Sequence, residues 1–282
     1  MEAINALLDR FRSSGLTYEP MSPKEYEQFR ADGLNATEGT RHLEDGYHCN
    51  LCKNKGFIVK VVEDDAGNYH QVMSDCKCVP TRNSIRRMER SGLKNIIKDY
   101  PFEKFEVAEP WQQTLKTAAM EYAANPEGWF FVGGQSGAGK THICTAICRE
   151  FLLAGRRVKY MPWRDAVVSI KANVNDPVVY HSVMDTAKGV DVLFIDDLFK
   201  TGKGADGAAM KPTAADINVA FEILNYRYNN PLSVTIISSE LSEDELLDID
   251  EAVGGRIYER SKAINITKDR SRNYRTRKRV TV

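Results

Sequence analysis

The stretch Gly134-Gln135-Ser136-Gly137-Ala138-Gly139-Lys140-Thr141 decides the fold, because it matches the phosphate-binding loop pattern G-x-x-x-x-G-K-[ST]. A short apolar strand is expected before it at residues 129–132, and an amphipathic helix after it at residues 141–153. Its glycines let backbone N–H groups point at phosphate oxygens, and the helix start adds positive potential. Lys140 then reaches the outer phosphates and Thr141 is a ligand of Mg²⁺. The stretch predicts an ATP site.

A second motif further along the chain supports this interpretation. The apolar strand expected at residues 190–195 ends in Asp196 and Asp197. Asp196 is expected to hold Mg²⁺, directly or through water, and Asp197 to orient or deprotonate the attacking water. Carboxylates at this place can also cap a helix, but their pairing with the loop favours the ATP site.

Three residues follow the loop on the predicted helix. His142 either lines the nucleotide pocket or is a hydrogen-bonded residue at the helix start. Cys144 and Cys148 share one face of the helix, and packing in the core explains both.

Strand and helix patterns alternate through this part of the chain. Further strands are expected at residues 157–161, 235–238 and 263–267. Alternation of this kind predicts an α/β domain, a parallel sheet with helices on both faces. Residues 201–212, rich in Gly, Ala and Lys, are interpreted as a loop.

Four segments describe the predicted organisation. Residues 1–45 form a helical head in which Ser22-Pro23 caps a helix, and residues 46–80 form a hairpin between two cysteine pairs. Residues 81–100 are a linker helix, and residues 101–282 are the nucleotide-binding domain.

The two cysteine pairs predict a structural metal site. The thiolates of Cys49, Cys52, Cys76 and Cys78 could serve as four ligands, and tetrahedral zinc is the metal ion that suits such a set. The second pair has one intervening residue instead of the commoner two, so His48 or His70 could replace a thiolate. Unliganded cysteines are the other alternative. Four protein ligands would leave no open position for catalysis, so zinc would fold the module.

Composition places few limits on function. Lys plus Arg and Asp plus Glu both number 39, so any contact with nucleic acid must come from local patches, such as the basic C-terminal segment at residues 270–279. No apolar run has the length of a membrane span, and the N-terminus lacks the pattern of a signal peptide. We expect a cytoplasmic protein, in which six cysteines indicate metal ligands or buried thiols.

Beyond these motifs the chain carries Gly254-Gly255-Arg256-Ile257-Tyr258-Glu259-Arg260-Ser261 and a terminal Asn273-Tyr274-Arg275. The whole order resembles the DnaC/DnaI-type replicative helicase loaders of the AAA+ ATPases, particularly the phage versions. It is also similar to the IstB-type transposition ATPases, which as a rule lack the cysteine module.

The resemblance implies a division of labour. The zinc-bearing module grips a hexameric replicative DNA helicase, and the AAA+ core, without a full helical lid, binds ATP and single-stranded DNA. Self-association on binding ATP or helicase would bring Arg260, the matched arginine finger, into a neighbouring subunit's ATP site, with Arg256 as the second choice. Arg275 matches the residue that senses nucleotide within its own subunit.

The sequence departs from the family pattern at Glu240, and it offers aromatic and basic residues for contact with DNA. In Ser238-Ser239-Glu240 the family commonly has Asn where Glu240 stands, so Ser238 or Ser239 could take the sensor role, or hydrolysis is slow. For DNA, Tyr160 and Trp163 offer stacking faces, although core packing explains them better. The charges for phosphate contact are Lys200, Lys203 and Lys211.

Three hypotheses result. The first is a helicase loader, the second an IstB-like ATPase that assists a transposase, and the third a nucleotide-gated adaptor with little hydrolysis.

Overall fold

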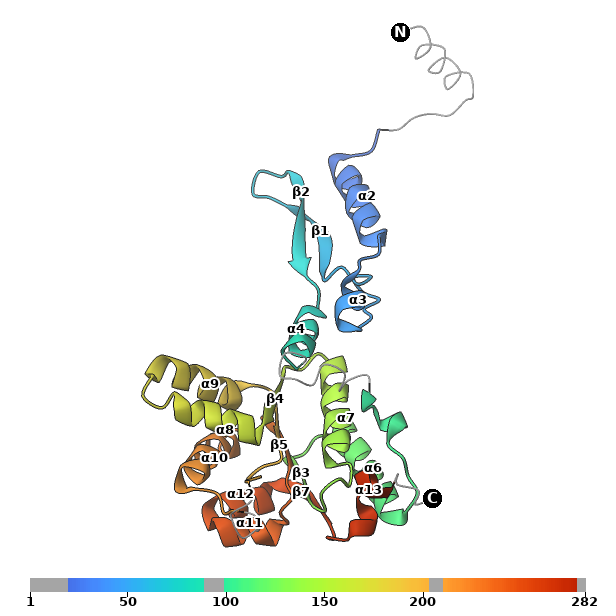
Figure 1. Cartoon of the computed structure of the whole chain (residues 1–282). Coiled ribbons are helices and arrows are strands. Elements are labelled where there is room, and N and C mark those ends of the chain that lie inside the picture. Colours follow the sequence, from blue (N-terminus) through green and yellow to red (C-terminus); the bar gives the residue numbers. More distant parts are fainter. Residues whose placement is uncertain (1–19, 89–98, 203–209, 278–282) are drawn as a thin grey trace. The chain divides into compact units, whose positions relative to one another are not determined.

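The computed structural model describes residues 20–88, 99–202 and 210–277. The chain divides into two compact units, Met1–Val79 and Pro80–Val282, each of which is described by itself (Figure 1). None of the helices in the described ranges combines the length and apolar character of a membrane span.

The N-terminal unit consists of two helices and a hairpin. Helix α2 (Pro23–Ala36) begins with a capping box, in which the Ser22 hydroxyl accepts the Glu25 N–H at 3.3 Å and the Glu25 carboxylate accepts the Ser22 N–H at 2.9 Å. The predicted Ser22-Pro23 helix start is therefore confirmed. The short helix α3 (Arg41–Asp45) follows.

The predicted hairpin is also present in this unit. Strands β1 (Phe57–Glu63) and β2 (Tyr69–Asp75) pair antiparallel. The turn between them closes on the Asp64 carboxylate, which accepts the N–H groups of Ala66 and Asn68 at 2.9 Å each. Helix α2 is attached to β1 by the Asn35 amide, which both donates to and accepts from the Val59 backbone.

The second unit contains a five-stranded parallel sheet in the order β4-β5-β6-β3-β7. Its strands are β3 (Trp129–Gly134), β4 (Val158–Pro162), β5 (Val192–Asp196), β6 (Val234–Ser238) and β7 (Ser261–Ile266). Its helices are α4 (Val79–Met88), η2 (Phe102–Lys104), α6 (Pro110–Ala124), α7 (Lys140–Leu153), α8 (Trp163–Ala172), α9 (Pro177–Gly189), α10 (Ala214–Tyr228), α11 (Glu243–Ile249), α12 (Glu251–Arg260), η3 (Arg270–Arg272) and α13 (Tyr274–Arg277). The predicted α/β class is confirmed, with strand ends that differ from the predicted ones by one or two residues.

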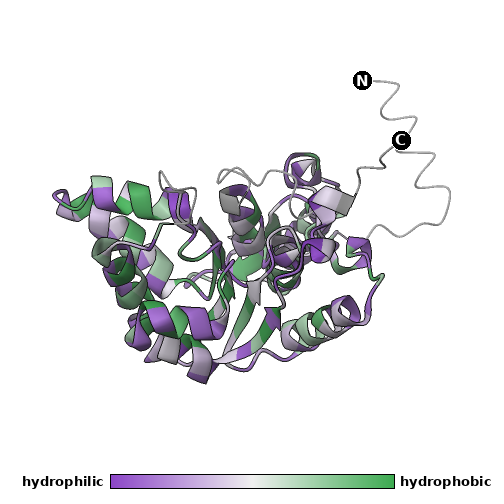
Figure 2. Ribbon diagram, turned by 60° about the horizontal axis from the view of Figure 1, so that its bottom comes forward, coloured by the Kyte–Doolittle hydropathy of each residue, from purple (hydrophilic) through white to green (hydrophobic). Residues whose placement is uncertain are grey.

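Both faces of the sheet are buried. On β3, Trp129 and Phe131 belong to the core shared with α8 to α12, whereas the Phe130 ring packs on Tyr122 of α6, with ring centroids 5.2 Å apart. Helix α7 lies against β4, β5 and β6. Figure 2 shows the strands as mostly hydrophobic between helices with hydrophilic outer sides. This burial explains the near-continuous apolar runs of the strands.

The predicted linker helix at residues 81–100 is described only in part. The predicted linker helix begins at Val79, and the side chains of Thr81, Arg82, Ser84 and Ile85 are buried. From Pro80 onwards the helix is grouped with the second unit. Residues 89–98 of the linker and Lys203 lie outside the described residues.

Candidate nucleotide and metal sites

The phosphate-binding loop connects β3 to α7 at the carboxyl edge of the sheet. Gly134 has a φ of 97°, and a Cβ there would collide with the carbonyl oxygen of Ile266. The next residue, Gln135, donates its N–H to the same carbonyl at 3.1 Å. Strand β7 thus fixes the start of the loop at a position that only glycine fits.

The side chain of Lys140 points back into this loop. Its Nζ donates to the carbonyl oxygens of Gly134 at 2.8 Å and Gln135 at 2.7 Å. The residue is 6% exposed, and burial lowers the pKa of its ammonium. A phosphate bound in the loop would therefore meet a cation already held inside it.

Asp196, at the end of β5, is surrounded by hydroxyl groups. Its carboxylate accepts from Thr141 Oγ1 at 3.0 Å, from the Tyr160 hydroxyl at 2.9 Å and from Ser238 Oγ at 2.5 Å. Burial raises the pKa of Asp196, against the effect of these hydrogen bonds. The structure thus brings Thr141 and Asp196, both predicted as Mg²⁺ ligands, into direct contact. Sequence reasoning missed the contacts of Ser238 and Tyr160.

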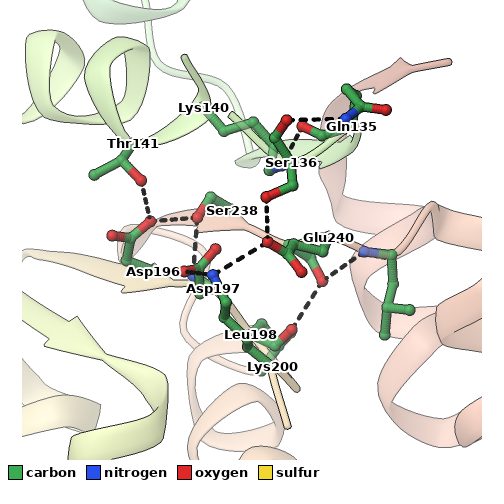
Figure 3. Close-up of polar contacts among 12 residues, drawn as sticks. Gln135, Ser136, Lys140, Thr141, Asp196, Asp197, Leu198, Lys200, Ser238 and Glu240 are labelled. Atoms are coloured by element: carbon green, nitrogen blue, oxygen red, sulfur yellow. Dashed lines mark hydrogen bonds and ion pairs between the residues drawn. The ribbon is translucent and has the colours of Figure 1, made fainter. Parts of the chain in front are cut away.

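A chain of polar contacts links the loop to the acid strand (Figure 3). Ser136 Oγ donates to Glu240 Oε1 at 2.7 Å, and Lys200 Nζ lies 3.1 Å from the same oxygen and 2.8 Å from Asp197 Oδ2. Burial acts to raise the pKa of Glu240, but the hydrogen bonds from Ser136 and Lys200 outweigh it and lower the pKa. Lys200, predicted to contact DNA, instead forms ion pairs in this cleft.

Three aromatic rings also line the cleft. The His142 ring stacks on Tyr100 with centroids 4.8 Å apart, and meets Phe105 edge-on at 5.3 Å. His142 Nε2 lies 3.0 Å from the Pro101 carbonyl oxygen, and burial lowers the pKa of the ring. His142 is thus hydrogen-bonded and also lines the cleft, and its contact with nucleotide stays a prediction.

Tyr274 and Arg275 also line this cleft. The Tyr274 N–H donates to the Gly137 carbonyl at 3.0 Å, and its hydroxyl donates to the Glu106 carbonyl at 2.8 Å. The cleft has a volume of about 660 Å³. Its lining includes Gly137, Gly139, Lys140, Thr141, His142, Asp196, Asp197 and Arg275 among the predicted site residues.

Arg260 does not line this cleft, and neither do Gly134, Gln135 and Ala138 of the phosphate-binding loop. Arg260 ends α12, where its guanidinium stacks over the Tyr228 ring at 4.7 Å and donates to the Tyr228 carbonyl at 3.1 Å. Arg256, one turn earlier, holds the Asn225 side-chain oxygen through two N–H groups at 2.8 and 3.1 Å. A role for either arginine in a neighbouring subunit stays a prediction.

The aromatic residues considered for DNA stacking are buried. Tyr160 is 6% exposed and Trp163 is 2% exposed, so neither offers a ring face to a base. The stacking hypothesis is wrong for both, and the alternative of core packing holds. Lys211 is exposed.

The four cysteines of the N-terminal unit converge. Their Sγ atoms all lie within 4.8 Å of one another, with Cys49 and Cys76 at 3.8 Å and Cys52 and Cys78 at 3.6 Å. Tetrahedral zinc with Zn–S bonds of about 2.3 Å places its sulfurs roughly 3.8 Å apart, so the spacing fits. The four thiols form this set without His48 or His70.

The turn around Cys52 supports a charged thiolate. Burial acts to raise the pKa of Cys52, but the Gly56 N–H, 3.2 Å from Sγ, and the neighbouring thiols outweigh it and lower the pKa to about 7. In contrast, Cys144 and Cys148 are fully buried in α7, and burial raises the pKa of both thiols. These two are core residues, as predicted.

A phosphate-binding loop beside β7, an acid pair on β5 and a strand order of β4-β5-β6-β3-β7 define a P-loop domain of the AAA+ class. The chain belongs to the family described as IstB-like ATP binding protein, whose model matches residues 77–279.

Two curated relatives and one solved structure place the chain further. It is 33% identical over 227 residues to the phage-like element PBSX protein XkdC of Bacillus subtilis (strain 168), covering 76% of this chain and 79% of that protein. It is 28% identical over 117 residues to the replicative helicase loader DnaC of Escherichia coli (strain K12), covering 40% of this chain and 48% of DnaC. The match thus spans about half of DnaC.

The structural match concerns the fold. A crystal structure of the DnaC helicase loader aligns with a TM-score of 0.51 and 21% identity, covering 60% of this chain and 98% of that one. The predicted resemblance to DnaC-type and IstB-type ATPases is confirmed.

Proposed function

We propose that this chain is an ATP-dependent helicase loader, which binds a hexameric replicative DNA helicase through its N-terminal cysteine unit and deposits it on single-stranded DNA. The observation that carries the proposal is the joining of a four-cysteine unit to an AAA+ domain whose relatives include a protein named replicative helicase loader. Its setting would be DNA replication, in the cytoplasm.

The cleft residues suit binding and hydrolysis of Mg²⁺-ATP. Lys140 would hold the outer phosphates, and Thr141 and Asp196, whose side chains touch at 3.0 Å, would share one Mg²⁺. Bound Mg²⁺ supplies the charge that neutralises the phosphates. Asp197 would orient the attacking water, and Arg275, beside the loop, would respond to the nucleotide.

Two further parts would act in assembly. Arg260 lies outside its own cleft, which suits a residue that completes the ATP site of a neighbouring copy. Zinc held by the four cysteines would keep the N-terminal unit folded for the helicase.

Co-purification of the full chain with candidate hexameric helicases tests the loader function. We expect the chain to capture a replicative helicase in an ATP-dependent manner, and we expect Cys76→Ser to abolish this capture. Lys140→Ala should keep the cysteine unit folded and should lose only the dependence of capture on nucleotide. A full chain that captures no helicase with ATP, with ADP or without nucleotide would contradict the proposal. Loading is then read from helicase transferred to a single-stranded DNA circle.

The family description favours one alternative, an IstB-like ATPase that assists a transposase. Tight binding of duplex DNA, together with indifference to helicases, would support this function over loading.

The contacts of Asp197 favour a second alternative, a nucleotide-gated adaptor with little hydrolysis. A general base held in an ion pair with Lys200 at 2.8 Å is poorly placed to take a proton. ATPase assays of Asp197→Asn and Arg260→Ala decide between the ATP-hydrolysing loader and the nucleotide-gated adaptor. We expect both substitutions to lower turnover at least about tenfold, and unchanged turnover in both would favour the adaptor.

A further inference from the structure

Lys200 connects parts of the nucleotide cleft that are far apart in the sequence. Its ammonium pairs with Asp197 at 2.8 Å and with Glu240 at 3.1 Å. The contacted Glu240 oxygen also accepts the Ser136 hydroxyl of the phosphate-binding loop (Figure 3). Burial acts to lower the pKa of Lys200, but its hydrogen bond to Asp197 and both carboxylate charges raise it, so the side chain is a cation.

The backbone that carries Lys200 is held in one conformation. Asp197 and Phe199 have φ values of 57° and 58°, in the left-handed region that residues other than glycine seldom adopt. The Leu198 N–H donates to the Ser238 carbonyl at 2.8 Å, and the Lys200 N–H donates to the Asp197 carbonyl at 2.9 Å. The first bond fixes the turn to the end of β6 and the second closes the turn, so the base of the lysine side chain is positioned before any nucleotide binds.

The end of the Lys200 side chain has room to move. The side chain is 36% exposed, and it lines both the nucleotide cleft and a second cleft of about 700 Å³, which also share Ser136 and Glu240. A lysine has rotatable bonds along its whole stem, so its ammonium can change partners without a change in the turn.

The charges around the loop create a problem that Lys200 can solve. Glu240 places a carboxylate on a loop hydroxyl, close to where phosphates are expected, and Asp197 adds a second carboxylate. Like charges at this distance in a partly buried site repel one another strongly. A third phosphate brings more negative charge toward these two carboxylates than a second one does, so ATP needs this cation more than ADP does.

We propose that Lys200 is the residue that senses the γ-phosphate in this cleft. With ATP, its ammonium exchanges Asp197 for the γ-phosphate and keeps its contact with Glu240, which frees Asp197 for water. With ADP it stays on the two carboxylates. The Lys200-Glu240 pair thus takes the place in which the family pattern has a neutral Asn. The inference rests on the proposed binding of ATP in this cleft.

Discrimination between ATP and ADP measures this role directly. Calorimetric titration of the full chain with Mg²⁺ and either ADP or a non-hydrolysable ATP analogue gives the two dissociation constants. In Lys200→Ala we expect affinity for the analogue to fall on the order of tenfold or more, and affinity for ADP to change by less than about threefold. Lys200→Arg should keep most of the discrimination because it keeps the charge.

Lys262→Ala is the matched control, because Lys262 forms an exposed ion pair with Glu121 away from the cleft. It should leave both affinities unchanged. Thermal unfolding of each variant confirms that it is folded. Equal losses for ADP and the analogue in Lys200→Ala, or no loss at all, would overturn the proposal.

The triple variant Lys200→Ala/Asp197→Asn/Glu240→Gln separates contact from screening, because it removes both carboxylates that Lys200 neutralises. If Lys200 contacts the γ-phosphate, the triple variant binds the analogue more weakly than Asp197→Asn/Glu240→Gln. If Lys200 only neutralises the two carboxylates, the two affinities are equal and the proposal fails. An unsubstituted chain that binds neither nucleotide would instead refute the ATP site, and one that binds ATP but no helicase would refute only the loader function.

Discussion

Replacing Cys76 by serine should unfold the N-terminal unit and leave the nucleotide-binding unit folded. The reason is the size of the core that would remain. Among residues 20–79, the buried hydrophobic side chains are Ala31, Val59, Cys52, Cys76 and Cys78. Three of these five are proposed metal ligands, so loss of the metal leaves two ordinary core residues.

Without zinc, the free energy gained by burying side chains in the N-terminal unit is smaller than the cost of ordering its backbone. Burial of one valine contributes about 1.5–3 kcal/mol and an alanine methyl about 0.8 kcal/mol. Ordering the backbone of the seven residues of β1 alone costs on the order of 10 kcal/mol. Structural zinc contributes about 10–16 kcal/mol at pH 7, which is the scale needed to hold the unit together. A serine hydroxyl does not replace the thiolate.

Hydrogen exchange measured by mass spectrometry reports both units in one experiment. We expect about one zinc per chain in the unsubstituted protein, and in Cys76→Ser loss of zinc with rapid exchange in β1 and β2. The amides of α7 should stay protected. Cys148→Ala is the control, because Cys148 is equally buried but lies outside the cluster. Persistent protection of the hairpin in Cys76→Ser, or after zinc chelation, would refute the reasoning.

Three further predictions concern the second unit. Burial raises the pKa of Asp196, so its ionisation lowers folding stability as pH rises through the folded-state pKa; Asp196→Asn should raise the melting temperature while reducing ATP hydrolysis about a hundredfold or more. A melting temperature that falls would contradict this account. Burial lowers the pKa of His142, so the unfolded chain binds more protons and stability is lost as pH falls below the unfolded value of about 6.5. In His142→Gln, denaturation curves between about pH 5 and 7 should depend less on pH, and an unchanged dependence would exclude the histidine. The fully buried Arg227 donates to the carbonyls of Ala187, Lys188 and Val190 at the end of α9. Arg227→Met should therefore lower the free energy of unfolding, measured with denaturant, by roughly 3–5 kcal/mol. A decrease under about 1 kcal/mol would show that these carbonyls find other partners.

The sequence predicted those features that depend on local pattern. The loop at residues 134–141, the apolar strands and the capped helix at Ser22 each follow from a run of neighbouring residues. The convergence of the four cysteines was predictable for the same reason, because the hairpin between the two pairs returns the chain to its start. Periodicity and turn residues are sufficient for such inferences.

Contacts that depend on strand order were not predictable in this way. Tyr160 reaches Asp196 because β4 lies beside β5, and the hydroxyl of Ser238 reaches the same carboxylate because β6 lies on the other side. The sequence predicts Lys200 as a charge for DNA phosphates, because its pairing with Glu240 depends on the left-handed turn after β5, which no local pattern indicates. Fully buried Arg227 also gave no sequence signal, because its acceptors are backbone carbonyls and the Thr235 hydroxyl, none of which forms a sequence motif.

The position of β6 explains why the residues after it matter so much. This strand lies between β3, which leads into the phosphate-binding loop, and β5, which carries the acid pair. Side chains at its carboxyl end can therefore touch both, as Ser238 does with Asp196 and Glu240 with Ser136. A neutral amide in this place needs no counter-charge, whereas a carboxylate does. Lys200, in the turn after β5 at the same edge of the sheet, supplies this counter-charge. Glu240 and Lys200 thus form one functional pair, in which the carboxylate needs the ammonium as its counter-charge.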